Sequence, residues 1–480
     1  MSSIRKNIAY QALYEILVLI LPFFTSPYIS RIFGAEYLGV FSYTYSIAYY
    51  FQIFGMLGIK FHGNRAIARS RDNREELNRV YSEILSLHII SCAISALVYI
   101  LYCFIFAEYR TYAMIQGLLV LSALFDVSWL FFGLERFKET VTRNSLIKLA
   151  SVAAIFLFIR SQEDFWVYVV IMAGSQLVSQ MILFGMARKY VRFSFVPLSS
   201  LGKHVKPLVV LFVPVLALSL FKFMDKIMLG SMGSKTELGY YENAERVLNI
   251  PLSVIFSFGS VMLPRMSNLM ANNAPESVDK YTGLSITYMT GLSYPMAFGL
   301  AGIAAVFAPV FWGNGFVASG TIIAVLAISI PFSTVANIIR NQDLIPRGKD
   351  DLYSWAIVAG AVVNLILNYF LIPRLQAVGV SIATVASEML VCFVELWYVR
   401  QKGNYFKSIA KSLIFFVPAL MMYMVIRYMG GAMGVHLYTL AAQVILGVLV
   451  FAALGLMTVV VCKDEICMNV IYRAFKKNRT

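Results

Sequence analysis

Two stretches of similar sequence, AEYLGVFSY at residues 35–43 and KTELGYYEN at residues 235–243, stand 200 positions apart in the chain. Both contain the pair Leu-Gly, and both follow the end of an apolar run. Each of these runs is the first of a set of six. The spacing therefore predicts an internal repeat whose halves cover residues 1–205 and 206–400.

The composition indicates a protein embedded in a membrane. Hydrophobic residues make up 59% of the 480 residues and charged residues 14%, against a usual ~45–50% and ~25%. The mean hydropathy is +0.73. So few charges cannot cover a soluble surface. The sequence therefore predicts an all-α polytopic membrane protein and excludes most soluble enzymes and nucleic-acid binders.

About fourteen apolar runs are long enough to cross a bilayer, because a helix needs ~20 apolar residues to span ~30 Å. We therefore expect about 12–14 transmembrane helices. An even number of spans in each half gives both halves the same orientation, related by a pseudo-two-fold axis along the membrane normal. The predicted parts are a six-helix lobe at 1–205, a second six-helix lobe at 206–400, two additional helices at 401–461 and a basic cytoplasmic tail at 462–480.

The charge distribution orients these spans. The chain has 40 Lys and Arg residues and 25 Asp and Glu residues, a net charge of +15. Of the 40 basic residues, 31 fall in the segments on one side of the predicted membrane and six on the other. Because basic residues gather in cytoplasmic loops, both termini are predicted to be cytoplasmic. This distribution explains most of the charge without a nucleic-acid partner.

Motifs of catalysis are absent from the sequence. It contains no Walker motif, no HExxH and no GxSxG, and its five Cys and four His residues show no metal-binding spacing. The predicted external loops are short, so a membrane polymerase or ligase with a catalytic loop is disfavoured. We therefore expect a transporter without a catalytic site, a metal or a cofactor.

The most unusual predicted span begins near Leu238 and carries Glu242, Arg246 and Asn249 at helical spacing on one face. Arg246 would lie ~12 Å along this helix, near the middle of the membrane. A guanidinium there can bind a phosphate through two hydrogen bonds in a water-filled cavity. The alternative is a structural ion pair between Glu242 and Arg246, four residues apart.

Other polar groups within apolar spans are further candidates, because such groups are expensive in lipid and usually face a cavity. Lys222, Asp225 and Lys226 end the preceding span and either line the cavity or extend to the membrane surface. Asp126 and Glu15 are candidates for ion coupling, or are hydrogen-bonded packing residues.

Tyrosines and amides supply a third group of polar side chains. The tyrosines of the second span either line a sugar path or belong to the core; they are Tyr43, Tyr45, Tyr49 and Tyr50. Gln176 and Gln180 lie four residues apart, a spacing that favours hydrogen bonding between helices.

Five stretches resemble one known family, in the order in which that family carries them. They are TSPYISRIFGAEYLGVFSYTYSIAYYF, GIKFHGNRAIARSRD, WLFFGLERFKETVTRN, MLGSMGSKTELGYYENAERV, and NQDLIPRGKDD followed by NLILNYFLIPRLQAVG. The chain is similar to Wzx-type polysaccharide flippases of the multidrug/oligosaccharidyl-lipid/polysaccharide exporter superfamily. The resemblance covers about Ser2 to Arg400.

The resemblance implies two six-helix lobes forming a V, plus two further helices. It implies alternating-access movement of an undecaprenyl-pyrophosphate-linked oligosaccharide to the outer leaflet of the bacterial cytoplasmic membrane, as in O-antigen, capsule or exopolysaccharide synthesis. The cavity of such flippases is cationic, a role that Arg246, Lys222, Lys226 and Arg31 match here. H⁺ or Na⁺ coupling and a polymerase partner are also implied.

The same superfamily offers two alternative functions. One is a cation-coupled multidrug exporter, in which acidic residues should dominate the cavity. The other is a flippase of the lipid-linked peptidoglycan precursor. Those flippases carry an Arg-Asp pair late in their first helix, where this chain has Thr25-Ser26, which disfavours the same substrate.

Overall fold

The computed structural model describes residues 2–401 and 404–461, except for the side chains of residues 2–17, 19, 198, 217, 218, 221 and 222. These residues form helices and the turns between them, with no strand in the described ranges, which confirms the all-α prediction. The chain divides into two compact units, residues 1–239 and 240–480. The repeat halves predicted from the sequence, with a boundary at 205, remain a prediction.

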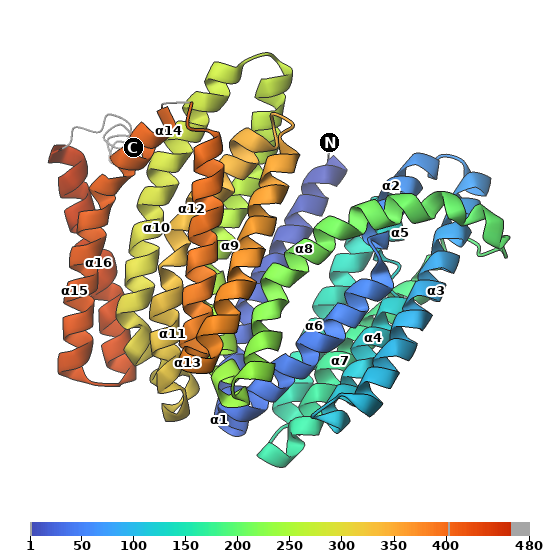
Figure 1. Cartoon of the computed structure of the whole chain (residues 1–480), viewed down its shortest axis with the longest axis horizontal. Helices are drawn as coiled ribbons and strands as arrows, with labels where there is room; N and C mark the ends of the chain where they lie inside the picture. Colours follow the sequence, from blue (N-terminus) through green and yellow to red (C-terminus); the bar gives the residue numbers. More distant parts are fainter. Residues whose placement is uncertain (1, 402–403, 462–480) are drawn as a thin grey trace. The chain divides into compact units, whose positions relative to one another are not determined.

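The first unit is built mainly from long helices, with the short helix α2 between α1 and α3 and the short helix α5 between α4 and α6 (Figure 1). Within it, α1 packs against α3, α4, α6 and α8, and α7 packs against α4 and α6. The helices of the first unit are α1 (Ser2–Met56), α2 (Ile59–Ser70), α3 (Arg74–Ile105), α4 (Arg110–Leu124), α5 (Ser128–Gly133), α6 (Phe137–Phe158), α7 (Phe165–Ala187), α8 (Gly202–Met232) and the start of α9 (Lys235–Ala271).

The second unit is organised around α10, which packs against α11, α12, α14, α15 and α16. A π-helical turn at Arg340–Leu344 follows α12, and the aspartates Asp279 and Asp343 both pair with Arg347 beside it. Beyond α9, the helices of this unit are α10 (Pro275–Trp312), α11 (Val317–Ala327), α12 (Ser329–Ile339), α13 (Asp350–Tyr398), α14 (Asn404–Ser412), α15 (Phe416–Met433) and α16 (Leu437–Val461).

Nine helices in the described part of the chain are long and apolar enough to cross a membrane, or ten if the bent pair Asn314–Ala327 and Ser329–Leu344 forms one span. Two helices are much longer than the ~20 residues that one crossing needs. α1 has 55 residues with a kink at Gly34 (φ 70°), and α13 has 49 with a break at Gln376. The protein is therefore multi-pass, and these lengths are compatible with further crossings.

The glycines of the repeated Leu-Gly pair lie against each other in the first unit. A Cβ atom on Gly39 would overlap the carbonyl group of Lys235, and one on Gly239 would overlap that of Ala35. The relation is reciprocal, since each glycine faces the residue four positions before the other. Only glycine permits this approach of two helix backbones, as in other small-residue contacts between membrane helices.

The short helices α2 and α5 form a second close contact. A Cβ atom on Gly63 of α2 would lie 2.7 Å from the Trp129 ring, and one on Gly133 of α5 would lie 2.6 Å from Ile67. Trp129 and Ile67 are fully buried in one hydrophobic cluster with residues of α3 and α7. This contact fixes the starts of α2 and α5 relative to each other.

A chain of polar contacts attaches the beginning of α8 to α2 and α3. His62 Nε2 lies 2.8 Å from His204 Nδ1, and His204 Nε2 lies 3.0 Å from Glu83 Oε2. Lys203 Nζ donates to the same carboxylate at 2.9 Å. Burial lowers the pKa of His62, and the nearby charges of His204 and of two arginines lower it further.

We predict that Gly239→Ala lowers the melting temperature of the purified protein by several degrees, because the added methyl group must push two packed backbones apart. Gly174→Ala is the matched control, since Gly174 lies within α7 with nothing within 4 Å of its Cβ position. Thermal unfolding in detergent measures both variants. Equal melting temperatures would contradict the tight crossing.

We predict that lowering the pH below ~6.5, the usual histidine value, reduces stability in part through His62. A histidine whose folded-state pKa is depressed stabilises the fold above its unfolded pKa, and this contribution is lost as the pH falls through the folded value. The His62→Gln variant should therefore lose less stability than wild type between neutral and mildly acidic pH. Parallel melting curves of the two proteins would contradict this role.

Candidate functional site

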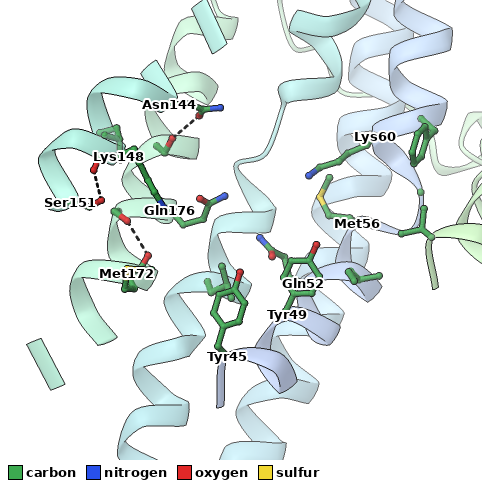
Figure 2. A pocket seen from close by; sticks show the side chains of 18 residues that line it. Tyr45, Tyr49, Gln52, Met56, Lys60, Asn144, Lys148, Ser151, Met172 and Gln176 are labelled. Carbon is green, nitrogen blue, oxygen red and sulfur yellow. Dashed lines mark hydrogen bonds between the residues drawn. The ribbon is translucent and has the colours of Figure 1, made fainter. Parts of the chain in front are cut away.

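A polar cavity of about 430 Å³ lies inside the first unit, between α1, α4, α6 and α7 (Figure 2). Its wall also includes Lys60 at the start of α2 and Val215 of α8. The polar lining residues are Tyr45, Tyr49, Gln52, Lys60, Asn144, Lys148, Ser151, Ser175, Gln176 and Ser179. The cavity therefore offers two cations together with hydroxyl and amide groups.

Helical periodicity places these side chains in the cavity. On α1, Tyr45, Tyr49 and Gln52 follow one another by four and three residues, a spacing that keeps them on one face. On α6, Asn144, Lys148 and Ser151 repeat the same spacing, and α7 adds a third such face. Figure 2 shows the labelled side chains of α1 opposite those of α6 and α7.

A buried arginine holds α6 against α7 beside the cavity. Arg143 donates to the carbonyl oxygen of Ser179 at 2.9 Å and to Gln180 Oε1 at 3.3 Å. It also donates to Asn144 Oδ1 at 2.6 Å, which fixes the neighbouring lining amide. Gln180 therefore takes part in an interhelical hydrogen bond, while Gln176 lines the cavity.

The charge of the cavity wall is positive. Among the described residues that line it, Lys60 and Lys148 are the charged ones and no carboxylate is present. A wall of lysines, amides and hydroxyls can bind an anion through the ammonium groups and sugars through the other polar groups.

Lys60 also forms an ion pair with a buried carboxylate behind the wall. Its ammonium group lies 3.2 Å from Asp126 Oδ2; the Lys60 side chain is 57% exposed and that of Asp126 4%. Asp126 lies in the break between α4 and α5, where its Oδ1 accepts a hydrogen bond from the backbone N–H of Ser128 at 3.1 Å. One lysine is thus shared between a buried aspartate and the cavity.

Arg246 and Glu242 form the structural ion pair that their spacing of four residues predicts as the alternative to ligand binding. Arg246 Nη2 lies 3.2 Å from Glu242 Oε1, and both side chains are partly buried. Asn249, on the same helix, is exposed. This geometry holds the guanidinium in place, and a ligand-binding role for Arg246 stays a prediction.

The other predicted site residues are distributed over the first unit. Asp225 and Lys226 of α8 are buried, and Lys226 Nζ lies 5.7 Å from the centre of the Phe223 ring. Arg31 is exposed. The side chains of Lys222 and Glu15 lie outside the described residues.

The four tyrosines predicted to line a sugar path take different positions. Tyr45 and Tyr49 line the cavity. Tyr43 lies under Lys235 Nζ, 4.5 Å from the ring centre, and Tyr50 donates to the carbonyl oxygen of Ser219. Half of this group therefore faces the cavity.

Sequence reasoning missed both cavity lysines. Lys60 and Lys148 stand at the ends of apolar runs, a position that predicts cytoplasmic charges. The polar face formed by Asn144, Lys148 and Ser151 was the signal available for Lys148. For Lys60 the sequence offered none, because its partner Asp126 is distant in the chain.

The fold and the cavity define a multi-pass membrane protein with an internal polar chamber, the architecture of a transporter. A family model described as "Polysaccharide biosynthesis protein" matches residues 4–270, more than half of the chain. The chain belongs to this family. The match confirms the predicted resemblance to polysaccharide flippases.

A curated relative from Escherichia coli (strain K12), described as "Putative O-antigen transporter", is 22% identical over 407 residues, or 83% of this chain and 97% of the relative. Among solved structures, "Lipid II flippase MurJ, inward closed conformation" superposes with a TM-score of 0.76 at 14% identity, covering 95% of this chain and 100% of that chain. An inward-facing "multidrug resistance MATE family transporter of the MOP superfamily" gives 0.64 at 14% identity, covering 81% and 96%. The two superpositions show a shared fold. All three proteins are described as transporters or flippases rather than enzymes.

We predict that Lys60→Ala destabilises the protein, because it leaves the buried Asp126 carboxylate without its cation. Adding Asp126→Asn should restore much of the lost stability, since the double variant buries no uncompensated charge. Melting temperatures of the two single variants and the double variant test this coupling. If the loss of melting temperature in the double variant equals the sum of the losses in the two single variants, Lys60 and Asp126 do not interact favourably, which would contradict the prediction.

Proposed function

We propose that this protein is a flippase for lipid-linked oligosaccharides. It moves undecaprenyl-pyrophosphate-linked repeat units from the cytoplasmic to the outer leaflet of the bacterial cytoplasmic membrane. The lysine-lined cavity of the first unit carries this proposal. Lys60 and Lys148 would hold the pyrophosphate, while the amide and tyrosine side chains would contact the sugars.

Several observations support this assignment. The family is described as polysaccharide biosynthesis proteins. The Escherichia coli relative is described as a "Putative O-antigen transporter" and aligns over 97% of its length. A pyrophosphate needs compensating cations to enter a membrane protein, and the cavity supplies two of them. Oligosaccharides need hydrogen-bonding groups, which make up much of the remaining wall.

The alternative functions fit the cavity less well. A multidrug exporter that binds cationic compounds would need carboxylates, and none occurs among the described lining residues. A flippase of the peptidoglycan precursor would need the same pyrophosphate chemistry, and a structure of that class shares the fold. The sequence Thr25-Ser26, in place of an Arg-Asp pair, favours a different oligosaccharide for this chain.

The finer features of the assignment belong to the same proposal. They are fourteen crossings in two lobes, cytoplasmic termini, alternating access, H⁺ or Na⁺ coupling and cooperation with a polymerase. Contributions to substrate binding from Arg246, Glu242 and Asn249 are also proposed. Further residues proposed to line the cavity are Lys222, Asp225, Lys226 and Arg31. Asp126 and Glu15 are proposed to take part in ion coupling.

We predict that a deletion strain complemented with Lys148→Gln makes at least ~10-fold less surface polysaccharide than the same strain complemented with wild type. The substitution removes one of the two cations proposed to bind the pyrophosphate. Lys189→Gln is the matched control, since Lys189 is exposed just beyond the end of α7 in the same unit. Protein levels in the membrane are measured in parallel by immunoblot.

Full complementation by Lys148→Gln together with Lys60→Gln would contradict binding of the substrate in this cavity. Normal surface polysaccharide in the deletion strain itself would contradict the proposed function.

A further inference from the structure

Lys60 lies between a buried carboxylate and the cavity that is proposed to bind a phosphate. On one side is the Asp126 carboxylate, 3.2 Å away and almost fully buried. On the other side is the cavity, to which more than half of the Lys60 side chain is open. One ammonium group cannot fully compensate both a carboxylate and a phosphate. A phosphate bound at Lys60 would therefore weaken the compensation of Asp126.

Apart from Lys60, the groups that hydrogen-bond the Asp126 carboxylate come from one residue, Ser128 at the start of the short helix α5. Its backbone N–H donates to Oδ1 at 3.1 Å, and its side chain adds a second, uncharged interaction. The neighbouring residues Val127 and Trp129 are apolar and fully buried. A buried carboxylate that loses its cation and gains a nearby anion binds a proton much more tightly.

We propose that Asp126 takes up a proton when a phosphate anion binds at Lys60, so that the anion and the proton enter the site together. This inference rests on the proposed function and specifies the ion coupling of the same site. No bond other than the O–H of the carboxyl group forms. The proton comes from water, and it returns to water when the anion leaves and Lys60 pairs with Asp126 again.

The other titratable groups around the pair come from α1, α3 and α6. On α3, His88 and Cys92 are buried close to Asp126, and the His88 ring also lies beside the backbone of Ala123. On α1, Tyr49 lies within range of Lys60 and also lines the cavity. From α6, Lys148 adds a second positive charge to the same cavity. Of these groups, His88 is the one that competes with Asp126 as the proton acceptor.

Linked binding has a direct physical consequence for transport. Each proton bound at Asp126 releases Lys60 from its internal partner, which leaves one positive charge for the phosphate. Proton binding and anion binding therefore strengthen each other by the same factor. The loaded site also carries less net negative charge, which lowers the cost of moving a pyrophosphate through a low-dielectric region.

Calorimetric titration of the purified full-length protein with farnesyl pyrophosphate tests the proposal. Titrations at neutral pH in buffers of different ionisation enthalpy give the number of protons taken up per bound probe. Asp126→Asn keeps the acceptor for the Ser128 N–H and cannot ionise, and Asp126→Ser is a second variant of the same kind. His88→Gln is the matched control for the other buried group.

The proposal predicts that wild type takes up about one proton more per bound probe than either Asp126 variant, and that His88→Gln behaves as wild type. Raising the pH by one unit should weaken wild-type binding up to ~10-fold relative to Asp126→Asn. Equal proton uptake in wild type and the Asp126 variants, or loss of uptake in His88→Gln alone, would overturn it. A wild type that does not bind the probe would instead overturn the proposed function.

Discussion

Burial of one carboxylate determines the arrangement of the first unit around its cavity. Asp126 lies in a break within a membrane-crossing segment, where an uncompensated negative charge costs several kcal/mol. Lys60 supplies the compensation, and it can do so only if α2 begins beside the start of α5. The glycines at the contact of α2 with α5 allow this approach. The cation that satisfies the buried acid is thereby also placed in the wall of the cavity.

Small residues set the geometry on which this arrangement depends. The contact of Gly39 with Gly239 fixes α1 against the start of α9, and the same α1 continues to the tyrosines and the glutamine of the cavity. In a membrane, helix association relies on close packing and hydrogen bonds rather than on exclusion of water. The repeated Leu-Gly pair, the strongest internal similarity in the sequence, therefore marks a packing site rather than a binding site.

The sequence predicted the class of protein because that class depends on properties of long segments, while the family was predicted from five short stretches that resemble it. Apolar runs and the asymmetry of basic residues are visible without any tertiary contact. Asp126 was also identifiable, since a carboxylate within an apolar run needs an explanation. Lys60 was not identifiable, because its position at the end of a span is typical of a cytoplasmic charge. Its role depends on a contact with a distant part of the chain.

Arg246 illustrates the opposite case. Its position within an apolar segment is unusual, and its ion pair with Glu242 could be predicted from their spacing. Whether a paired guanidinium also binds a ligand depends on what lies opposite it, and no local pattern in one helix contains that information. For the lysine cavity, the sequence indicated the tyrosines of α1 and Gln176 of α7 separately, and only the tertiary fold brings them together with the polar face of α6.

The most direct test of this account is leaflet exchange of a fluorescent undecaprenyl-pyrophosphate oligosaccharide in liposomes that contain the purified protein. The account predicts rapid exchange by wild type and by Lys189→Gln, and exchange close to that of protein-free liposomes for the variant combining Lys60→Gln and Lys148→Gln. Exchange by this double variant at the wild-type rate would show that the substrate does not depend on the lysine cavity and would contradict the account.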